Sequence, residues 1–88
     1  MDLENKFQEA VKNSKNISQK PTNEELLKLY ALYKQSTEGN VIGERPEGFD
    51  FKGAAKYDAW SEIKGAEKST CMQEYIDLVE SLLSKYNG

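Results

Sequence analysis

Apolar residues recur every three or four positions along most of the chain, a period that predicts α-helices. The period is clearest over residues 67–86, and it also predicts helices over about 3–17, 22–38 and 51–64. Their apolar stripes contain, in chain order, Phe7, Ala10, Val11 and Ile17; Leu26, Leu27, Leu29, Tyr30, Leu32 and Tyr33; Ala55, Ala59, Trp60 and Ile63; and Met72, Tyr75, Ile76, Val79, Leu82, Leu83 and Tyr86. No segment alternates like a strand, so we predict one all-α domain over residues 1–88, a four-helix bundle.

Helix boundaries are marked by residues with specific backbone preferences. Pro21 ends the first helical pattern, and Thr22 with Glu25 forms the sequence of a capping box for the second. Gly39 and Gly65 can take the left-handed conformation that ends helices. We therefore expect the second helix to run from about residue 22 to 38 and the third to stop before Gly65.

A long connection separates the second and third predicted helices. Residues 39–50 contain three glycines and Pro46, which argues against regular structure, and such a loop is long for so small a domain. We predict that Val41, Ile42 and Phe49 anchor this loop on the helices. Its length would also allow neighbouring helices to depart from a simple up-and-down order.

Composition limits the size of the core and the kind of partner. With 88 residues, 38% of them hydrophobic, the chain can bury roughly 60–65% of its unfolded surface in one small core. Twelve basic and 15 acidic residues give a net charge of −3, which argues against nucleic-acid binding by long-range attraction. Any site for an anion must therefore be a local cluster of cations.

The residues needed for common catalytic and metal sites are missing. The sequence has no histidine, which removes the usual general base and the commonest metal ligand. Carboxylates alternate with lysines as on solvated helix faces, and no zinc or nucleophile spacing is present. We expect a protein that is not an enzyme and that holds no metal and no cofactor.

One cysteine, Cys71, excludes an internal disulfide and fits a reducing compartment. We expect an ordinary buried side chain rather than a reactive thiol at this position. The first residues form no signal-peptide pattern, and nowhere do 18 apolar residues follow one another. The expected location is the cytoplasm.

Tyrosines and lysines share helical faces in two segments. Tyr30, Tyr33 and Lys34 lie three and four residues apart on one predicted helix, and Lys52 and Lys56 lie four apart on the next. Phenols beside clustered ammonium groups suit a phosphate-bearing ligand with an aromatic base. The alternative is that the tyrosines edge the core and the lysines are merely solvated.

These blocks carry a resemblance to a known family. The stretches YALYKQSTEG from Tyr30 and ERPEGFDFKGAAKYDAW ending at Trp60, followed by a tyrosine in a last amphipathic helix, resemble the acyl-CoA-binding protein family. The likeness runs from about Phe7 to about Tyr86, in the family's order and spacing. It implies the family's four-helix bundle, with the long loop between the second and third helices packed against it.

The resemblance also implies roles for individual residues. Residues matching Tyr30, Lys34 and Lys56 would contact the 3′-phosphate of coenzyme A, and those matching Tyr33 and Tyr75 would enclose its adenine and ribose. Lys15 matches a further contact near the nucleotide, and Lys52 matches a weaker position at the rim. We expect Leu26, Leu27 and Ala10 to line the groove for the acyl tail, with the alternative that they only fill the core.

Three positions depart from the family's pattern. Tyr57 stands where many relatives carry tryptophan, Ala54 where many carry a basic residue, and Ser14 interrupts the apolar stripe of the first helix. We place Trp60 in the core. Loss of a charge at Ala54 puts the strength of headgroup binding in doubt.

The resemblance implies a monomeric carrier of long-chain fatty acyl-CoA that buffers this pool and delivers it to enzymes or membranes. One rival is a helical protein-interaction module that uses the wide apolar face of the second helix. A weaker rival is a hydrolase acting on acyl-CoA. Binding of acyl-CoA, and the fate of its thioester, separates the three.

Overall fold

Four α-helices make up the computed structural model, which describes residues 2–87, and no strand occurs within that range. The elements are α1 (Asp2–Asn13), a 3₁₀ turn η1 (Ser14–Asn16), α2 (Asn23–Thr37), α3 (Phe51–Glu62) and α4 (Lys68–Asn87). The predicted all-α fold with four helices is confirmed. None of the helices in the described range is both long and apolar enough to cross a membrane.

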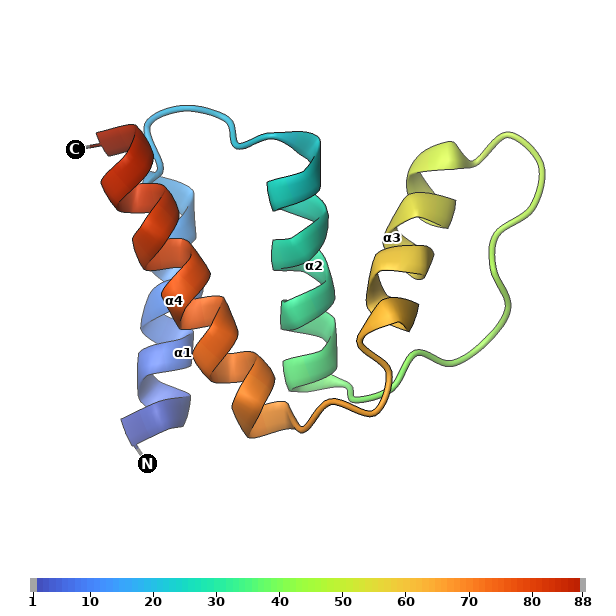
Figure 1. The fold of residues 1–88 in the computed structure, drawn as a ribbon, viewed down its shortest axis with the longest axis horizontal. Helices are drawn as coiled ribbons and strands as arrows, with labels where there is room; N and C mark the ends of the chain where they lie inside the picture. The colour runs from blue at the N-terminus through green and yellow to red at the C-terminus, as the bar shows by residue number, and fades with distance from the viewer. Residues whose placement is uncertain (1, 88) are drawn as a thin grey trace.

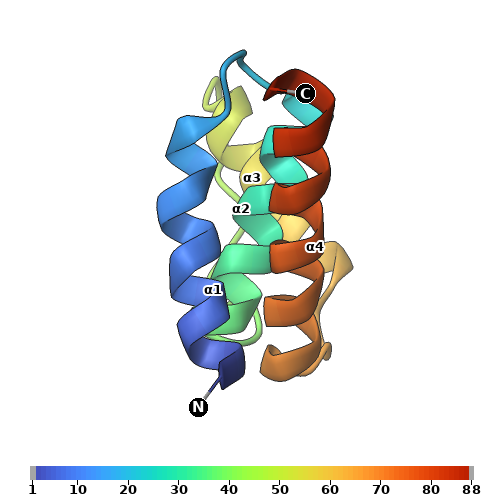
Figure 2. The same ribbon diagram turned by 90° about the vertical axis from the view of Figure 1, so that its left-hand side faces the viewer.

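Three helices, α1, α2 and α4, pack around the core, and α3 lies beside them. α4 packs against α1 and α2, whereas α3 packs against α2 on the side away from the other two (Figure 1). Seen from the left of that view, α1 and α4 stand side by side with α2 and α3 behind them (Figure 2). The long connection runs along the outer side of α3, back to the level at which α2 starts, so α2 and α3 run in the same direction (Figure 1).

The core lies where α1, α2 and α4 meet. Its buried cluster takes Phe7 and Ala10 from α1 and Leu32 from α2, and its α4 members are Cys71, Tyr75, Ile76 and Val79. These α4 residues follow the predicted period because positions three and four apart share one helix face. α3 adds Trp60 and Ala54, both 8% exposed, whereas the predicted inward residues Ala55, Ala59 and Ile63 are only half-buried.

α1 is shorter than the sequence predicts. It ends at Asn13, and the hydroxyl of Ser14 donates to the carbonyl of Val11 at 2.7 Å within the turn that follows. The predicted extension to Ile17 is wrong, because the next residues bond to the end of α4 instead: the Ser18 backbone N–H donates to the Asn87 side-chain oxygen at 2.7 Å.

The capping box that starts α2 is confirmed. The Thr22 hydroxyl accepts from the Glu25 backbone N–H at 3.1 Å, and the Glu25 carboxylate accepts from the Thr22 N–H at 2.8 Å. The same carboxylate also accepts from Lys85 Nζ at 2.9 Å and from the Tyr86 hydroxyl at 2.8 Å. One side chain thus caps α2 and ties it to the end of α4.

We expect Glu25 to make the free energy of unfolding depend on pH. The backbone N–H of Thr22, followed by Lys85 and Tyr86, lowers the pKa of Glu25 from 4.5 to about 2. Since the folded pKa lies below the unfolded one, its stabilisation is complete above about pH 4.5 and is lost as the pH falls toward 2. Urea unfolding of Glu25→Gln should therefore show a deficit at pH 6 that shrinks between pH 4.5 and 2. Glu80→Gln, at an exposed position of α4, is the control. A loss of unfolding free energy that does not depend on pH would contradict this role of Glu25.

The connection from α2 to α3 is held by polar contacts and not by the apolar side chains that we predicted. Ile42 and Phe49 are 83% and 92% exposed, so their prediction as anchors is wrong, and Val41 is half-buried. Side chains of α3 bond both to the loop's backbone and to its side chains. The Tyr57 hydroxyl donates to the Gly43 carbonyl at 3.0 Å, and Arg45 donates to both carboxylate oxygens of Asp58 at 2.9 and 3.0 Å.

The first residues of the loop close over a buried polar group. The Trp60 indole N–H donates to the Gly39 carbonyl at 2.8 Å and to the side-chain oxygen of Gln35 at 3.1 Å, and Gln35 is only 1% exposed. Gln35 in turn donates to the Asn40 side chain at 2.9 Å. Gly39 has φ = 85°, the left-handed conformation predicted for the end of α2. This network joins the end of α2 to α3.

Candidate ligand-binding site

Three aromatic rings from three helices meet beside the core. The ring of Phe7 on α1 lies 6.0 Å from that of Tyr33 on α2 and 5.1 Å from that of Tyr75 on α4, and the two tyrosine rings are 6.3 Å apart. Phe7 and Tyr75 are buried, whereas Tyr33 is 39% exposed. This aromatic cluster therefore has a buried base and one ring open to solvent, which is the form of a stacking platform.

The Tyr75 phenol stays neutral in this setting. Burial raises the pKa of Tyr75, and the neighbouring Ser14 side chain opposes that shift only in part. A neutral hydroxyl can donate as well as accept a hydrogen bond. Ser14, the polar interruption in the first apolar stripe, thus lies against the aromatic cluster, a role that its sequence position alone does not reveal.

Two lysines from different helices lie over aromatic rings next to this cluster. Lys56 Nζ on α3 is 5.3 Å from the centre of the Tyr30 ring on α2, and Lys34 Nζ on α2 is 5.2 Å from the centre of the Trp60 ring. A cation over a ring face is attracted by the ring's electron density. Packing of α3 against α2 therefore brings Lys56 to the Tyr30 ring and the Trp60 ring to Lys34.

Lys34 is the most constrained of these cations. Its ammonium group donates to the carboxylate of Glu38 one turn later, and this contact raises the pKa of Lys34. Burial opposes the shift, while Tyr30 and Tyr33 lie close enough to add smaller contributions in the same direction. Lys34 is therefore charged at neutral pH and sits among the predicted site residues.

The structure thus brings together Tyr30, Tyr33, Lys34, Lys56 and Tyr75 from α2, α3 and α4. Lys15 and Lys52 are exposed, and no hydrogen bond or ion pair joins them to this group within residues 2–87. Lys52 stands one turn before Lys56 on α3, and Lys15 follows Ser14 directly. Their place in the site therefore stays a prediction.

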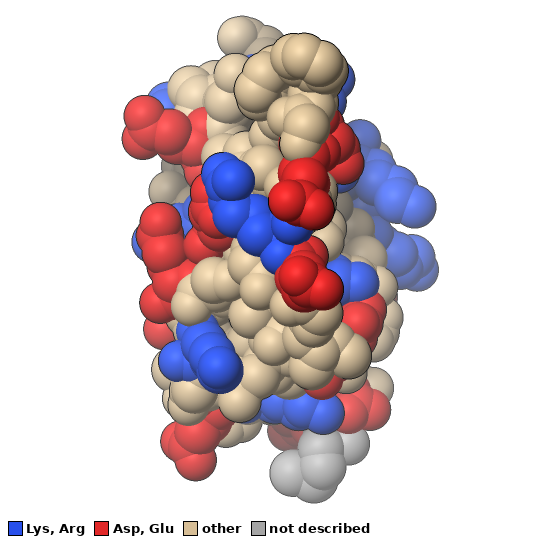
Figure 3. Space-filling view, turned by 90° about the vertical axis from the view of Figure 1, so that its right-hand side faces the viewer, with Lys and Arg blue, Asp and Glu red and all other residues tan. Residues whose placement is uncertain are grey.

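Charge is distributed unevenly over the face formed by α3 and its loop. Basic and acidic side chains alternate across the middle of this face, while lysine or arginine side chains gather along its upper right edge (Figure 3). A local cationic edge on a molecule of net charge −3 is the arrangement that a local anion site requires.

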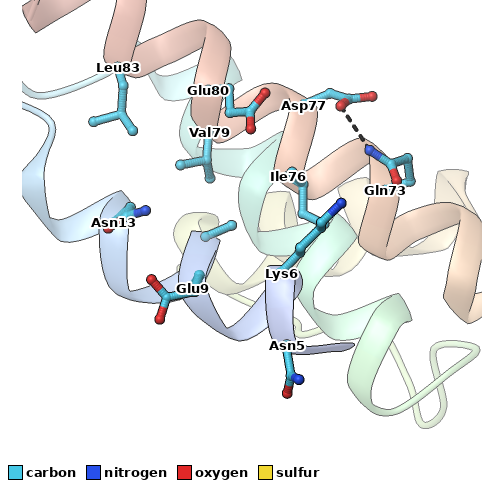
Figure 4. A pocket seen from close by; sticks show the side chains of 11 residues that line it. Asn5, Lys6, Glu9, Asn13, Gln73, Ile76, Asp77, Val79, Glu80 and Leu83 are labelled. Atoms are coloured by element: carbon cyan, nitrogen blue, oxygen red, sulfur yellow. Dashed lines mark hydrogen bonds between the residues drawn. The ribbon is translucent and has the colours of Figure 1, made fainter. Parts of the chain in front are cut away.

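The predicted tail residues do not share one hollow. Ala10 lies in a hollow of about 390 Å³ between α1 and α4, where Lys6, Glu9, Asp77 and Glu80 from the two helices form a polar rim (Figure 4). Leu27 lines a different hollow of about 570 Å³ between α2 and α3, and Leu26 is half-buried and lines neither. Ala10 therefore packs in the core, beside Ile76 and Val79.

The hollow between α2 and α3 has an apolar floor that sequence analysis assigned to the core. Ala31 is buried there, and Ala55, Ala59 and Ile63 are half-buried along its wall. The closely spaced alanines of α3 were the only signal for it, because small side chains leave room between two helices. A third hollow, of about 450 Å³, lies under the loop beside Phe51. None of these three hollows is lined by the site residues Tyr30, Tyr33, Lys34, Lys56 and Tyr75.

Metal ligands and the cysteine are further candidate sites. Within residues 2–87, no three cysteine or acidic side chains gather where they could hold a metal ion. Cys71 is 1% exposed, and burial raises the pKa of its thiol, so the protonated form prevails near neutral pH. The cysteine is therefore an ordinary buried side chain, as predicted.

Comparison with known proteins identifies this class of helical fold. The family model described as "Acyl CoA binding protein" matches residues 4–79. The acyl-CoA-binding protein homolog 1 of Caenorhabditis elegans is 46% identical over 82 residues, which cover 93% of this chain and 95% of that protein. The acyl-CoA-binding protein of Saccharomyces cerevisiae is 42% identical and covers 93% and 94% of the two chains.

A solved structure extends the likeness to three dimensions. The crystal structure of Oryza sativa acyl-CoA-binding protein 2 superposes with a TM-score of 0.95 at 38% identity, covering 100% of this chain and 96% of that one. The chain belongs to the acyl-CoA-binding protein family.

Proposed function

We propose that this protein is a carrier that binds one long-chain fatty acyl-CoA reversibly and performs no covalent chemistry on it. The observation that carries the proposal is the convergence of Lys34 and Lys56 with Tyr30, Tyr33 and Tyr75 from three helices. The chain's membership of the acyl-CoA-binding protein family and the names of its relatives support the proposal. Absence of histidine from the sequence fits binding without catalysis.

The 3′-phosphate of the ligand is the group that needs the cations. A phosphate monoester near neutral pH carries close to two negative charges and several acceptor oxygens. Lys34, Lys56 and the Tyr30 hydroxyl can satisfy these oxygens by charge-assisted hydrogen bonds, each contributing about 1.5–3 kcal/mol. Lys15 and Lys52 at the rim would add weaker, salt-screened attraction.

The adenine needs an aromatic surface, and the aromatic cluster provides one. Tyr33 presents its ring to solvent with Phe7 and Tyr75 behind it. Stacking of a base on such a ring is worth about 1–3 kcal/mol in nucleic-acid complexes. The headgroup would thus be oriented by its phosphate and its base together.

The acyl tail would follow α2 from the headgroup toward its first turn. Leu27 lies three residues before Tyr30 and seven before Lys34, so these residues share one stripe of α2. Leu27 also borders the apolar hollow shared with α3, and Leu26, the residue before it, is half-buried. We therefore propose Leu26, Leu27 and the alanines of α3 for the tail and no longer assign Ala10 to it.

Isothermal titration with octanoyl-, lauroyl- and palmitoyl-CoA, with free coenzyme A as control, tests this function. Each methylene that leaves water contributes about 0.8 kcal/mol, so affinity should rise by up to about fourfold per methylene until the groove is filled. Bound ligand should also raise the melting temperature. Equal affinity for free and palmitoyl-coenzyme A, or no binding of either, would overturn the proposal. Release of free thiol above the spontaneous rate would show a hydrolase instead.

We further propose that the carrier works in the cytoplasm as a monomer and passes its ligand to acyl-CoA-using enzymes or membranes. All residues of the cluster come from one chain, so no second subunit is needed to complete it. A single buried cysteine suits a reducing compartment. Sedimentation at micromolar concentration, with and without ligand, tests the monomeric state.

A further inference from the structure

Lys34, the cation proposed to bind the 3′-phosphate, is already paired within the protein. Its ammonium group donates to the Glu38 carboxylate four residues later on α2 while lying over the Trp60 ring. The Lys34 side chain is 23% exposed, and that of Glu38 is 53% exposed. A carboxylate open to solvent therefore stands directly at the proposed phosphate position.

Stabilisation of α2 does not explain why a carboxylate stands at position 38. Glu38 is the C-cap of α2, where the carbonyl end of the helix dipole makes negative charge unfavourable. Its contribution to ending the helix is made by its backbone N–H, which donates to the Lys34 carbonyl at 2.7 Å and would remain with any side chain. Within residues 2–87, the carboxylate makes no hydrogen bond or ion pair other than the one with Lys34.

We propose that Glu38 determines ligand specificity by competing with the 3′-phosphate for Lys34. The inference rests on the proposed function, because it names a residue that tunes that same site. In this arrangement Glu38 weakens binding of acyl-CoA. It also reduces the ratio of the affinity for acyl-CoA to the affinity for its 3′-dephospho form.

The physical reason is that binding must replace one anion by another. When the phosphate reaches Lys34, either the ion pair with Glu38 breaks or two anions share one cation. The first outcome loses an attraction, and the second adds repulsion between the carboxylate and a nearly divalent phosphate. A ligand without the 3′-phosphate incurs neither cost. Within residues 2–87 no ion pair involves Lys56, whose ammonium group lies over the Tyr30 ring.

Glu38→Gln tests this inference, because glutamine keeps the size and the hydrogen-bond acceptor but removes the charge. We expect palmitoyl-CoA to bind roughly two- to tenfold more tightly, the range of a solvent-exposed charge interaction with a divalent anion. Affinity for 3′-dephospho-palmitoyl-CoA should change by less than about twofold. The gain should shrink at high salt because it is electrostatic.

Two matched variants separate a local effect from overall charge. Glu47→Gln changes the net charge equally on the exposed loop and should leave both affinities nearly unchanged. In a Lys34→Gln background, Glu38→Gln should no longer favour the phosphorylated ligand to the same extent, because the residue for which the two anions compete is gone. Unfolding in urea checks that each variant is folded.

The outcomes distinguish this inference from the function on which it rests. If the unaltered protein binds neither palmitoyl ligand, the proposed function fails. If it binds both and Glu38→Gln leaves their ratio of affinities unchanged, or strengthens both equally, Glu38 has no role in specificity while the carrier function stands.

Discussion

Lys34→Ala is expected to weaken binding of palmitoyl-CoA by roughly 10- to 150-fold while changing binding of its 3′-dephospho form by less than about threefold. The larger loss corresponds to one charge-assisted hydrogen bond of about 1.5–3 kcal/mol, which only the phosphate monoester can make. Lys34 is suited to this contact because it lies close to Tyr30 and Tyr33 and its ammonium group is held over the Trp60 ring. Titration calorimetry with both ligands measures the difference.

Lys12→Ala is the matched control for this experiment. Lys12 lies on α1, its side chain is 79% exposed, and it lines none of the three hollows. Its removal deletes the same charge outside the proposed ligand site, so both affinities should change little. Equal losses for the two ligands in Lys34→Ala would remove Lys34 from its assigned role.

Trp60→Ala is expected to lower the free energy of unfolding by about 3–5 kcal/mol. The ring is 8% exposed, and replacing it with a methyl group leaves a cavity between α2 and α3. The change also leaves the buried Gln35 oxygen and the Gly39 carbonyl without the indole donor. Urea unfolding followed by circular dichroism measures the loss.

Trp60→Phe separates the contribution of the buried ring from that of the indole hydrogen bonds. Phenylalanine keeps most of the apolar volume but has no N–H, so its loss should be clearly smaller than that of alanine. Because α2 is the only helix that α3 contacts within residues 2–87, amide exchange should accelerate first in α3 and in the loop that follows Gly39. A Trp60→Ala variant as stable as the unaltered protein would show that the ring does not hold α3 in place.

The helices themselves could be predicted well from the sequence. The period of α4 identified its buried face, because a helix that packs on one side must repeat its apolar residues every three or four positions. The capping box at Thr22 was equally secure, since both of its hydrogen bonds lie within four consecutive residues. Local interactions of this kind leave their signature in a short stretch of sequence.

Segments whose conformation depends on distant partners were predicted less well. α1 ends before Ile17 because Ser18 bonds to Asn87 and Tyr86, about seventy residues away. The loop after α2 was expected to bury Ile42 and Phe49, yet side chains of α3 hold it through hydrogen bonds. Hydrophobicity alone could not reveal this, because polar contacts can hold a loop without any apolar anchor.

For the candidate site, too, local relations could be predicted from the sequence and relations between helices could not. By itself the sequence determined which residues share a helix face, such as Tyr30 with Lys34 and Lys52 with Lys56, since three and four residues make one turn. Only the tertiary structure decided that Lys56 of α3 lies over Tyr30, that Phe7 of α1 completes the aromatic cluster, and that Ala10 and Leu27 line separate hollows. Those relations depend on how α3 and α4 pack against α2, and helix packing is set by side chains that are far apart in the chain.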